Sequence, residues 1–172
     1  MSALRELLLR YNPNINIYAY TNLINDIVSG VAKYPLTYVP YLNITKKEVD
    51  VVMSVEGKMA RRVLFALLCI AKFGNARTAK NNNWVNLPMS SVFAYSNVST
   101  SRSRQDIIIK SLRDAGYIEY SPIIDNLNIR VPFIDDSDSF VWRVYDFDNL
   151  GYQLEMNSGV KGYMICDYCG RI

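Results

Sequence analysis

The chain has 172 residues, of which 50% are hydrophobic and 20% charged, and its formal net charge is +3. That length and apolar content suit one domain of ordinary size, and they exclude the low hydrophobicity and high net charge of disordered proteins. Histidine is absent, which excludes Ser-His-Asp and Cys-His nucleophiles and mixed cysteine–histidine zinc sites. Because glycine-rich phosphate-binding loops are also absent, we expect that the protein is not an enzyme.

The sequence shows no feature of a membrane or secreted protein. Its longest apolar run, Val63 to Ala71, is far shorter than the ~20 residues that a membrane helix needs. The first residues, MSALRE, contain neither the basic start nor the apolar stretch of a secretion signal. Three cysteines cannot all pair within one chain, which favours a reducing compartment. We therefore expect a cytoplasmic protein with no membrane partner.

The charge is distributed unevenly along the chain. Residues 46–130 carry a net charge of +6, whereas residues 131–172 carry −4 and residues 1–45 carry +1. A basic middle segment beside an acidic tail indicates contact between the middle and a polyanion such as nucleic acid. The alternative is a solvated surface on which positive charges happen to cluster.

Residues 1–45 predict an N-terminal helical segment. Apolar residues recur at helical spacing over 3–11 and again over 17–34, so we expect two amphipathic helices followed by an extended connector over 35–40. The sequence Asn12-Pro13-Asn14 separates the helices, because proline disfavours helical geometry in the residue before it. We expect this segment to pack on the rest of the chain or to form the interface of a homodimer.

Residues 46–134 predict the main domain, in which helices and strands alternate. Thr45 and Glu48 form a capping-box pattern that begins a helix, and Gly74 is suited to the position just after the end of the next helix. A further helix ends at Gly116. The expected later helices are 58–73, 89–95 and about 100–115, and the expected strands are 84–87, 117–121, 127–134 and 140–145.

The order of elements from 58 to 134 resembles that of the winged helix-turn-helix superfamily. The most diagnostic residues are Asn97-Val98-Ser99 and the run Leu112-Arg113-Asp114-Ala115-Gly116-Tyr117-Ile118. In that superfamily a polar-capped recognition helix ends in such a run and passes directly into the first strand of the wing. The resemblance implies an α+β, mainly helical fold, with a winged helix-turn-helix core over 46–134, N-terminal helices over 1–45 and a short C-terminal tail of β-structure over 135–172.

The resemblance also implies that the helix from about Thr100 to Ala115 enters the major groove of double-stranded DNA. Arginine bonds bidentately to guanine, glutamine to adenine, and hydroxyl groups bond to phosphate. The DNA-binding residues expected on this helix are Thr100, Ser101, Arg102, Ser103, Arg104, Gln105, Lys110 and Arg113. The wing turn adds Asn126, Asn128 and Arg130, and phosphate contacts are expected from Arg61 and Arg62. Asp106 on the same helix would repel phosphate unless it accepts a hydrogen bond from cytosine or pairs with Lys110 one turn later.

The C-terminal sequence Cys166-Asp167-Tyr168-Cys169-Gly170 is half of a zinc knuckle. Tetrahedral zinc needs four ligands, and Cys69 lies in the middle of an apolar helix, where we expect it to be a core residue. Three interpretations stay open: a zinc ion shared between two chains through Cys166 and Cys169, a redox-active dithiol, or thiols without a metal.

These patterns favour a DNA-binding protein that acts as a transcriptional regulator or a replication accessory factor. The richness in Asn, Ile and Tyr resembles small proteins of phages and mobile elements. The alternative is an adaptor whose winged helix binds another protein without contacting DNA. The acidic and aromatic segment that would then provide a protein interface contains Asp135, Asp136, Asp138, Phe140, Trp142, Tyr145, Asp146, Phe147 and Asp148.

Overall fold

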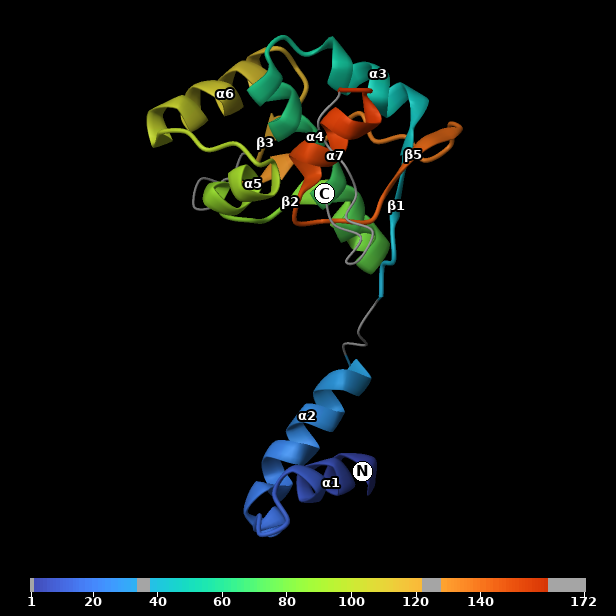
Figure 1. Ribbon diagram of the computed structural model, residues 1–172, viewed down its shortest axis with the longest axis vertical. Coiled ribbons are helices and arrows are strands. Elements are labelled where there is room, and N and C mark those ends of the chain that lie inside the picture. Colours follow the sequence, from blue (N-terminus) through green and yellow to red (C-terminus); the bar gives the residue numbers. More distant parts are fainter. Residues whose placement is uncertain (1, 34–37, 122–127, 161–172) are drawn as a thin grey trace. The chain divides into compact units, whose positions relative to one another are not determined.

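The computed structural model of the chain describes residues 2–33, 38–121 and 128–160 (Figure 1). Within these residues the fold is α+β, with seven α-helices, two short 3-10 helices and two small antiparallel sheets. The expected α+β, mainly helical class is therefore confirmed. Contacts divide the chain into a small N-terminal unit, Met1–Tyr38, and a larger unit, Val39–Ile172. No helix in the described ranges is long and apolar enough to cross a membrane.

The N-terminal unit consists of α1 (Ser2–Tyr11), the 3-10 helix η1 (Ile17–Tyr20) and α2 (Thr21–Lys33). Both helices that the sequence predicts are present, but the second begins as a 3-10 turn before it becomes α-helical. The turn after α1 is stabilised by Asn12, whose side-chain oxygen accepts a hydrogen bond of 3.1 Å from the main-chain N–H of Asn14.

The core of the larger unit is built around α4 (Lys58–Arg77), which runs through its centre (Figure 1). Every residue from Arg62 to Cys69 is buried, because several other helices and strands pack against this helix. The helix continues past Phe73, so the prediction that Gly74 follows its end is wrong. A Cβ at this position would lie 2.6 Å from the side-chain nitrogen of Asn81, so a larger residue here would require the Asn81 side chain to move.

Three short strands form an antiparallel sheet next to α4. They are β2 (Trp84–Val85), β3 (Glu119–Tyr120) and β4 (Ile129–Arg130), and β4 lies between the other two. The predicted strands are present at these places but are shorter than 84–87, 117–121 and 127–134. Between β2 and β3 the chain forms α5 (Met89–Tyr95) and α6 (Arg102–Asp114).

A second antiparallel pair, which we call the β1–β5 ribbon, joins two parts of the chain that are distant in sequence. It consists of β1 (Leu42–Thr45) and β5 (Phe140–Val144). The strand expected over 140–145 is confirmed, whereas the sequence does not predict β1. Both strands turn apolar side chains into the core, where Ile44 and Val144 are fully buried.

The helix α3 (Lys46–Ser54) begins with the capping box that the sequence predicts. The Thr45 hydroxyl accepts from the main-chain N–H of Glu48 at 3.4 Å, and the Glu48 carboxylate accepts from the main-chain N–H of Thr45 at 2.8 Å. The same carboxylate lies 2.8 Å from the ammonium nitrogen of Lys72 on α4, and both side chains are buried. This ion pair therefore joins the start of α3 to the last turns of α4.

The last described helix, α7 (Leu150–Asn157), is not predicted by the sequence analysis. Leu150 and Leu154 are its only large apolar residues that are almost completely buried. Two such positions are too few to show a helical period in the sequence. It packs against α4 and follows directly after the β1–β5 ribbon. The described part of 135–172 is therefore built into the larger unit.

Candidate nucleic-acid interface

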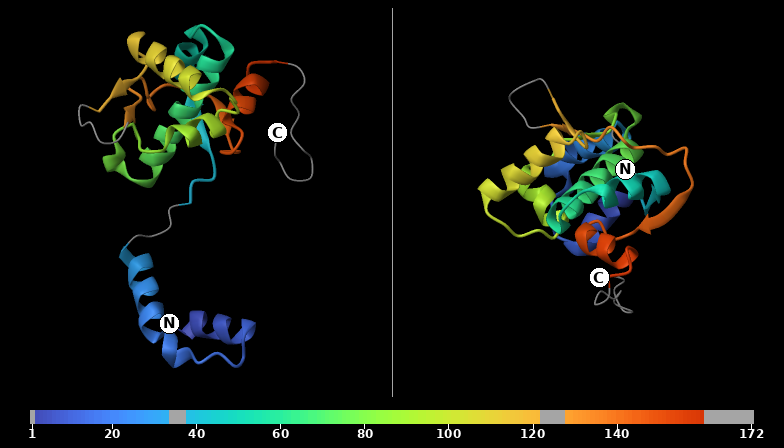
Figure 2. Two further views of the ribbon diagram at one scale, coloured as in Figure 1. Left: turned by 90° about the vertical axis from the view of Figure 1, so that its left-hand side faces the viewer. Right: turned by 90° about the horizontal axis from the view of Figure 1, so that it is seen from above.

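The helix α6 lies on the outside of the larger unit, on the side away from the β1–β5 ribbon (Figures 1 and 2). Ile108, Ile109 and Leu112 are buried on its inner side, where it packs against α4. The helix begins at Arg102 and not at about Thr100, which corrects the predicted start. Ser101 is its N-cap, because its side chain accepts from the main-chain N–H of Arg104 at 3.4 Å.

The solvent-facing side of α6 carries several of the residues that the sequence analysis assigns to DNA. Ser103, Arg104 and Lys110 are exposed, and the Arg102 side chain is 76% exposed. The sequence analysis missed Ile107, which is 59% exposed on the same helix. Three consecutive isoleucines cannot all face one side of a helix, and the helical period counted from Leu112 identifies Ile107 as the outward one.

Two arginines of α6 pair with carboxylates on the same helix. The Arg102 side chain lies 3.5 Å from Asp106, which differs from the expected pairing of Asp106 with Lys110. The Arg113 guanidinium lies 2.6 Å from Asp114, and this hydrogen bond raises the pKa of Arg113. Because exposed ion pairs contribute little free energy, both arginines can exchange these partners for a phosphate.

The residues around the start of α6 stabilise the helix end. The Gln105 side-chain amide donates to the main-chain carbonyl of Thr100 at 3.4 Å, and Gln105 is partly buried. Its main-chain N–H donates to the carbonyl of Ser101 at 3.0 Å. Gln105 therefore faces back along the chain, away from the outermost side of the helix.

Two of the predicted wing residues belong to the central strand of the three-stranded sheet or adjoin it, since Arg130 is on β4 and Asn128 comes just before β4. Asn128 is partly buried, and its main-chain carbonyl accepts from the N–H of Ser121 at 2.9 Å. Arg130 is also partly buried, and its guanidinium lies 3.1 Å from the carboxylate of Glu119 on β3. Asn126, at the turn between the strands, lies outside the described residues.

Arg62 is held inside the fold, which differs from the predicted contact with phosphate, whereas Arg61 is partly buried and bonds to a neighbouring carbonyl. The Arg62 side chain is only 10% exposed; its guanidinium lies 3.1 Å from Glu155 on α7 and donates at 3.2 Å to the main-chain carbonyl of Asn97. Arg61 donates at 2.9 Å to the main-chain carbonyl of Val55. At the start of α4, Lys58 and Met59 are exposed, Arg61 is partly buried and Arg62 is buried, and both guanidinium groups bond to neighbouring acceptors.

The turn between α5 and α6 is held in place by α7. Asn97 has a φ of 52°, a left-handed conformation that asparagine tolerates better than most residues. Its side-chain amide donates to Asn149 at 3.2 Å, and its side-chain oxygen accepts from the main-chain N–H of Tyr152 at 3.2 Å. The sequence marks Asn97 as one of the diagnostic residues but not as a contact of α7, since no local pattern indicates partners so far along the chain.

The three cysteines lie in two parts of the chain, one on α4 and two near the C-terminus. Cys166 and Cys169, the proposed zinc ligands, lie outside the described residues. Cys69 is a buried free cysteine of α4, as expected, and burial raises the pKa of its thiol. Within 2–33, 38–121 and 128–160, no group of three or more cysteine or acidic residues is placed to hold a metal ion.

The aromatic residues of the acidic and aromatic segment divide between the core and the surface. Trp142 packs edge-on against Phe65 at 6.3 Å between ring centroids, and Phe147 packs against Phe73 at 5.0 Å. These two side chains therefore belong to the core of the larger unit.

The other two aromatic residues of that segment form a row on the outer face of the β1–β5 ribbon. Phe140 and Tyr145 are 51% and 60% exposed. The Arg143 guanidinium lies 5.0 Å from the Phe140 ring centroid and 4.9 Å from that of Tyr41, which in turn lies 5.9 Å from Tyr145. We call these four residues the aromatic row.

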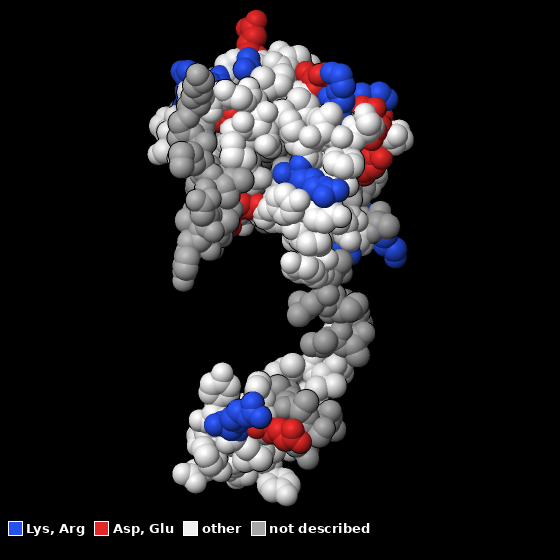
Figure 3. Space-filling model, turned by 45° about the vertical axis from the view of Figure 1, so that its right-hand side comes forward, with Lys and Arg blue, Asp and Glu red and all other residues white. Residues whose placement is uncertain are grey.

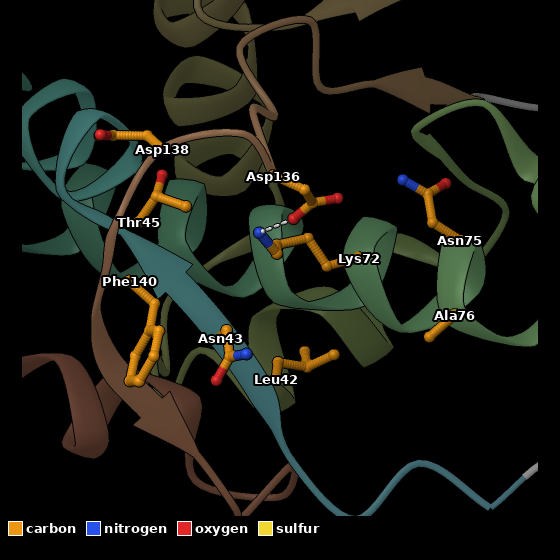
Figure 4. Close-up of a pocket in the computed structure, with 9 residues that line it drawn as sticks. All are labelled: Leu42, Asn43, Thr45, Lys72, Asn75, Ala76, Asp136, Asp138 and Phe140. Atoms are coloured by element: carbon orange, nitrogen blue, oxygen red, sulfur yellow. Dashed lines mark hydrogen bonds and ion pairs between the residues drawn. The ribbon is translucent and has the colours of Figure 1, made fainter.

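A pocket of about 430 Å³ lies between β1 and the C-terminal turns of α4 (Figure 4). Lys72 points toward Asp136 at its wall, with 2.6 Å between the ammonium nitrogen and the carboxylate. The buried carboxylate of Glu48 is the second partner of the same ammonium group. The described lining therefore presents an ion network in which the Lys72 ammonium group has two carboxylate partners.

The arrangement around α6 is suited to contact with a polyanion, because a short exposed helix presents arginine, lysine and hydroxyl donors on a rigid, anchored element.

Comparisons with protein-family models, with curated proteins and with solved structures return no match to this chain.

Proposed function

We propose that the protein is a winged helix-turn-helix protein that binds double-stranded DNA by inserting α6 into the major groove. The observation that carries this proposal is that α6 buries Ile108, Ile109 and Leu112 and exposes the basic side chains of Arg102, Arg104 and Lys110. With 13 residues, α6 is about 20 Å long, and a helix fits the major groove, which is about 12 Å wide.

The order of the elements also supports the proposal. Along the chain, α4, β2, α5, α6, β3 and β4 follow one another as they do in the superfamily that the sequence resembles. The three strands pair into one sheet, and β3 and β4 of this sheet follow α6 in the chain. The turn between β3 and β4 would form the wing. A wing at that place is able to contact the DNA backbone beside the groove.

The exposed side chains of α6 suit direct reading of base edges. Arg102 and Arg104 lie in its first turn, the part of a recognition helix that reaches the bases. Ile107 is an apolar group of the kind that contacts the methyl group of thymine. We infer a role in transcriptional regulation or in DNA replication.

The experiment is a titration of a labelled random duplex of about 25 base pairs by fluorescence anisotropy, at two salt concentrations. We expect the affinity of the unmodified protein to fall steeply with salt, because counterions are released from the phosphates. The double variant Arg102→Ala/Arg104→Ala should bind about 10- to 100-fold more weakly, and its salt slope should be smaller by about one for each arginine that binds a phosphate.

The matched control is Lys46→Ala/Lys80→Ala, which removes two exposed cations outside α6. It makes the same change in net charge, so its effect measures the non-specific electrostatic contribution alone. A folded Arg102/Arg104 variant that binds as tightly as the unmodified protein would contradict the assignment of α6. Equal losses in the two variants would contradict it as well.

A second candidate function, an adaptor that binds another protein, is favoured by the aromatic row. Aromatic and arginine side chains are enriched at the centres of protein interfaces, and this row lies on an exposed ribbon face on the side of the unit away from α6. Absence of duplex binding at micromolar protein and low salt would favour this adaptor function over the DNA-binding one.

A further inference from the structure

The N-terminal unit leaves an unusual share of its apolar side chains in solvent. Leu7 and Tyr11 lie one turn apart on α1 and are 49% and 84% exposed. Leu23 and Ile27 lie one turn apart on α2 and are 55% and 48% exposed. Further exposed large apolar residues of this unit are Leu9, Tyr18, Tyr20, Val28 and Tyr38.

This unit does not cover these side chains by itself. Among its residues whose burial is described, Ile24 alone is buried. A segment of fewer than about 40 residues is usually too small to bury a sufficient core without a disulfide, a metal or a partner. The two amphipathic helices therefore need a further surface to cover their apolar sides.

We propose that a second copy of this chain covers them, so that α1 and α2 of two chains form a symmetric four-helix interface. In a four-helix bundle each helix buries one apolar stripe, and the α1 and α2 helices of two chains supply four helices. The exposed parts of Leu7, Tyr11, Tyr18, Tyr20, Leu23, Ile27 and Val28 amount to on the order of 700 Å² for each chain. A standard stable interface buries about 800 Å² per partner, so the available area is close to what a dimer needs.

The charge of the unit also favours a second copy over a strongly charged partner. Only five of its 38 residues are charged, and these are Arg5, Glu6, Arg10, Asp26 and Lys33. Figure 3 shows one basic and one acidic patch side by side on this unit. A surface with little net charge meets its own copy without strong repulsion, as an interface with two-fold symmetry requires.

If the proposed function is correct, the dimer would bind a DNA site with two-fold symmetry. This consequence rests on the proposed function. Two copies of α6 related by a two-fold axis read two inverted half-sites, as in other dimeric helix-turn-helix proteins. The dimer itself needs no DNA, so it is tested on the protein alone.

The experiment is sedimentation equilibrium of the full chain without DNA, over a range of concentrations. We expect a species of twice 19.7 kDa for the unmodified protein. The variant Leu23→Lys/Ile27→Lys should sediment as a monomer, and Leu23→Ala/Ile27→Ala should dimerise at least about 10-fold more weakly. Lysine and alanine both favour helix, and both positions lie outside the larger unit, so circular dichroism should show an unchanged helix content.

The control is Asn22→Lys/Ser29→Lys, which adds the same charge to the polar side of α2 and should leave the dimer intact. Two outcomes would overturn the proposal. One is a monomeric unmodified protein at about 100 μM, a concentration at which even a weak specific interface associates. The other is a dimer that persists in the Leu23/Ile27 lysine variant, because the contact would then lie elsewhere, for example at Cys166 and Cys169.

Discussion

The main-chain N–H of Tyr152 donates a hydrogen bond of 3.2 Å to the side-chain oxygen of Asn97, 55 residues earlier in the chain. This bond fixes α7 onto the turn that leads into α6. The side-chain amide of the same asparagine donates to Asn149 at 3.2 Å, and its main-chain carbonyl accepts from Arg62. One residue of the turn between α5 and α6 thus bonds to both α4 and the start of α7.

Replacing Asn97 should separate its two contributions to stability. Asn97→Gly keeps the left-handed φ of 52° but loses both side-chain hydrogen bonds, which should lower the free energy of unfolding by about 1–3 kcal/mol. Asn97→Ala loses the same bonds and also strains the backbone, so we expect a further loss of about 1 kcal/mol. Urea denaturation of the two variants measures both values. Equal stability of the two variants would show that the turn adopts another conformation.

Gly151 is the second residue that allows α7 to approach this turn. A Cβ at this position would lie 1.8 Å from the main-chain oxygen of Ser96 and 3.2 Å from the Arg62 side chain. Backbone oxygen cannot move aside as a flexible side chain can, so Gly151→Ala should destabilise the protein by about 2 kcal/mol or more.

The control for this substitution is Gly30→Ala on α2. No atom outside its local helix lies within 4 Å of the position of a new Cβ there. Alanine favours helix more than glycine by up to about 1 kcal/mol, so this variant should be as stable as the unmodified protein or slightly more stable. Thermal unfolding of both variants gives the comparison, and a Gly151→Ala protein as stable as its control would contradict the close packing of α7.

The elements that depend on local sequence could be predicted. The capping box at Thr45 and Glu48 uses residues three positions apart, and the inner side of α6 follows the helical period of Ile108 and Leu112. Both features depend only on residues within one or two helical turns of each other. The spacing of these residues in the sequence is therefore enough to predict them.

The elements that depend on distant partners could not be predicted. The strand β1 is stable because β5 pairs with it about 100 residues later, and α7 is too short to show a clear amphipathic pattern. Arg62 illustrates the consequence for the candidate site. A basic pair at a helix start resembles a phosphate-binding surface until α7 places Glu155 beside it.

The buried ion pair between Glu48 and Lys72 should contribute far more to stability than the exposed pair between Lys46 and Asp50. Glu48 is fully buried, and Glu48→Gln would take away one of the two carboxylates, Glu48 and Asp136, that neutralise the Lys72 ammonium. Breaking such a buried pair costs about 3–5 kcal/mol.

Lys46→Gln is the matched control for Glu48→Gln. It removes a cation whose side chain is 66% exposed, next to an Asp50 side chain that is 62% exposed, and such pairs contribute about 0.5 kcal/mol or less. Urea denaturation measures the free energy of unfolding of each variant. The two values can be compared directly if the slope of this free energy against urea concentration is the same in both variants. Similar losses in both would show that the Glu48 site is open to water.

Asp135 should make the protein sensitive to acid. Its carboxylate accepts from the side chain and main chain of Ser137 and from the Lys47 ammonium at 2.9 Å, and these hydrogen bonds lower its pKa from 3.8 to about 2. Because the folded protein holds this proton less tightly than the unfolded chain does, the resulting stabilisation is complete above about pH 4. It is lost as the pH falls toward about 2.

Asp135→Asn and Ser137→Ala should therefore both show a smaller decrease in melting temperature between about pH 4 and pH 2 than the unmodified protein shows. If all three proteins lose stability equally over this interval, another carboxylate is responsible for the acid sensitivity.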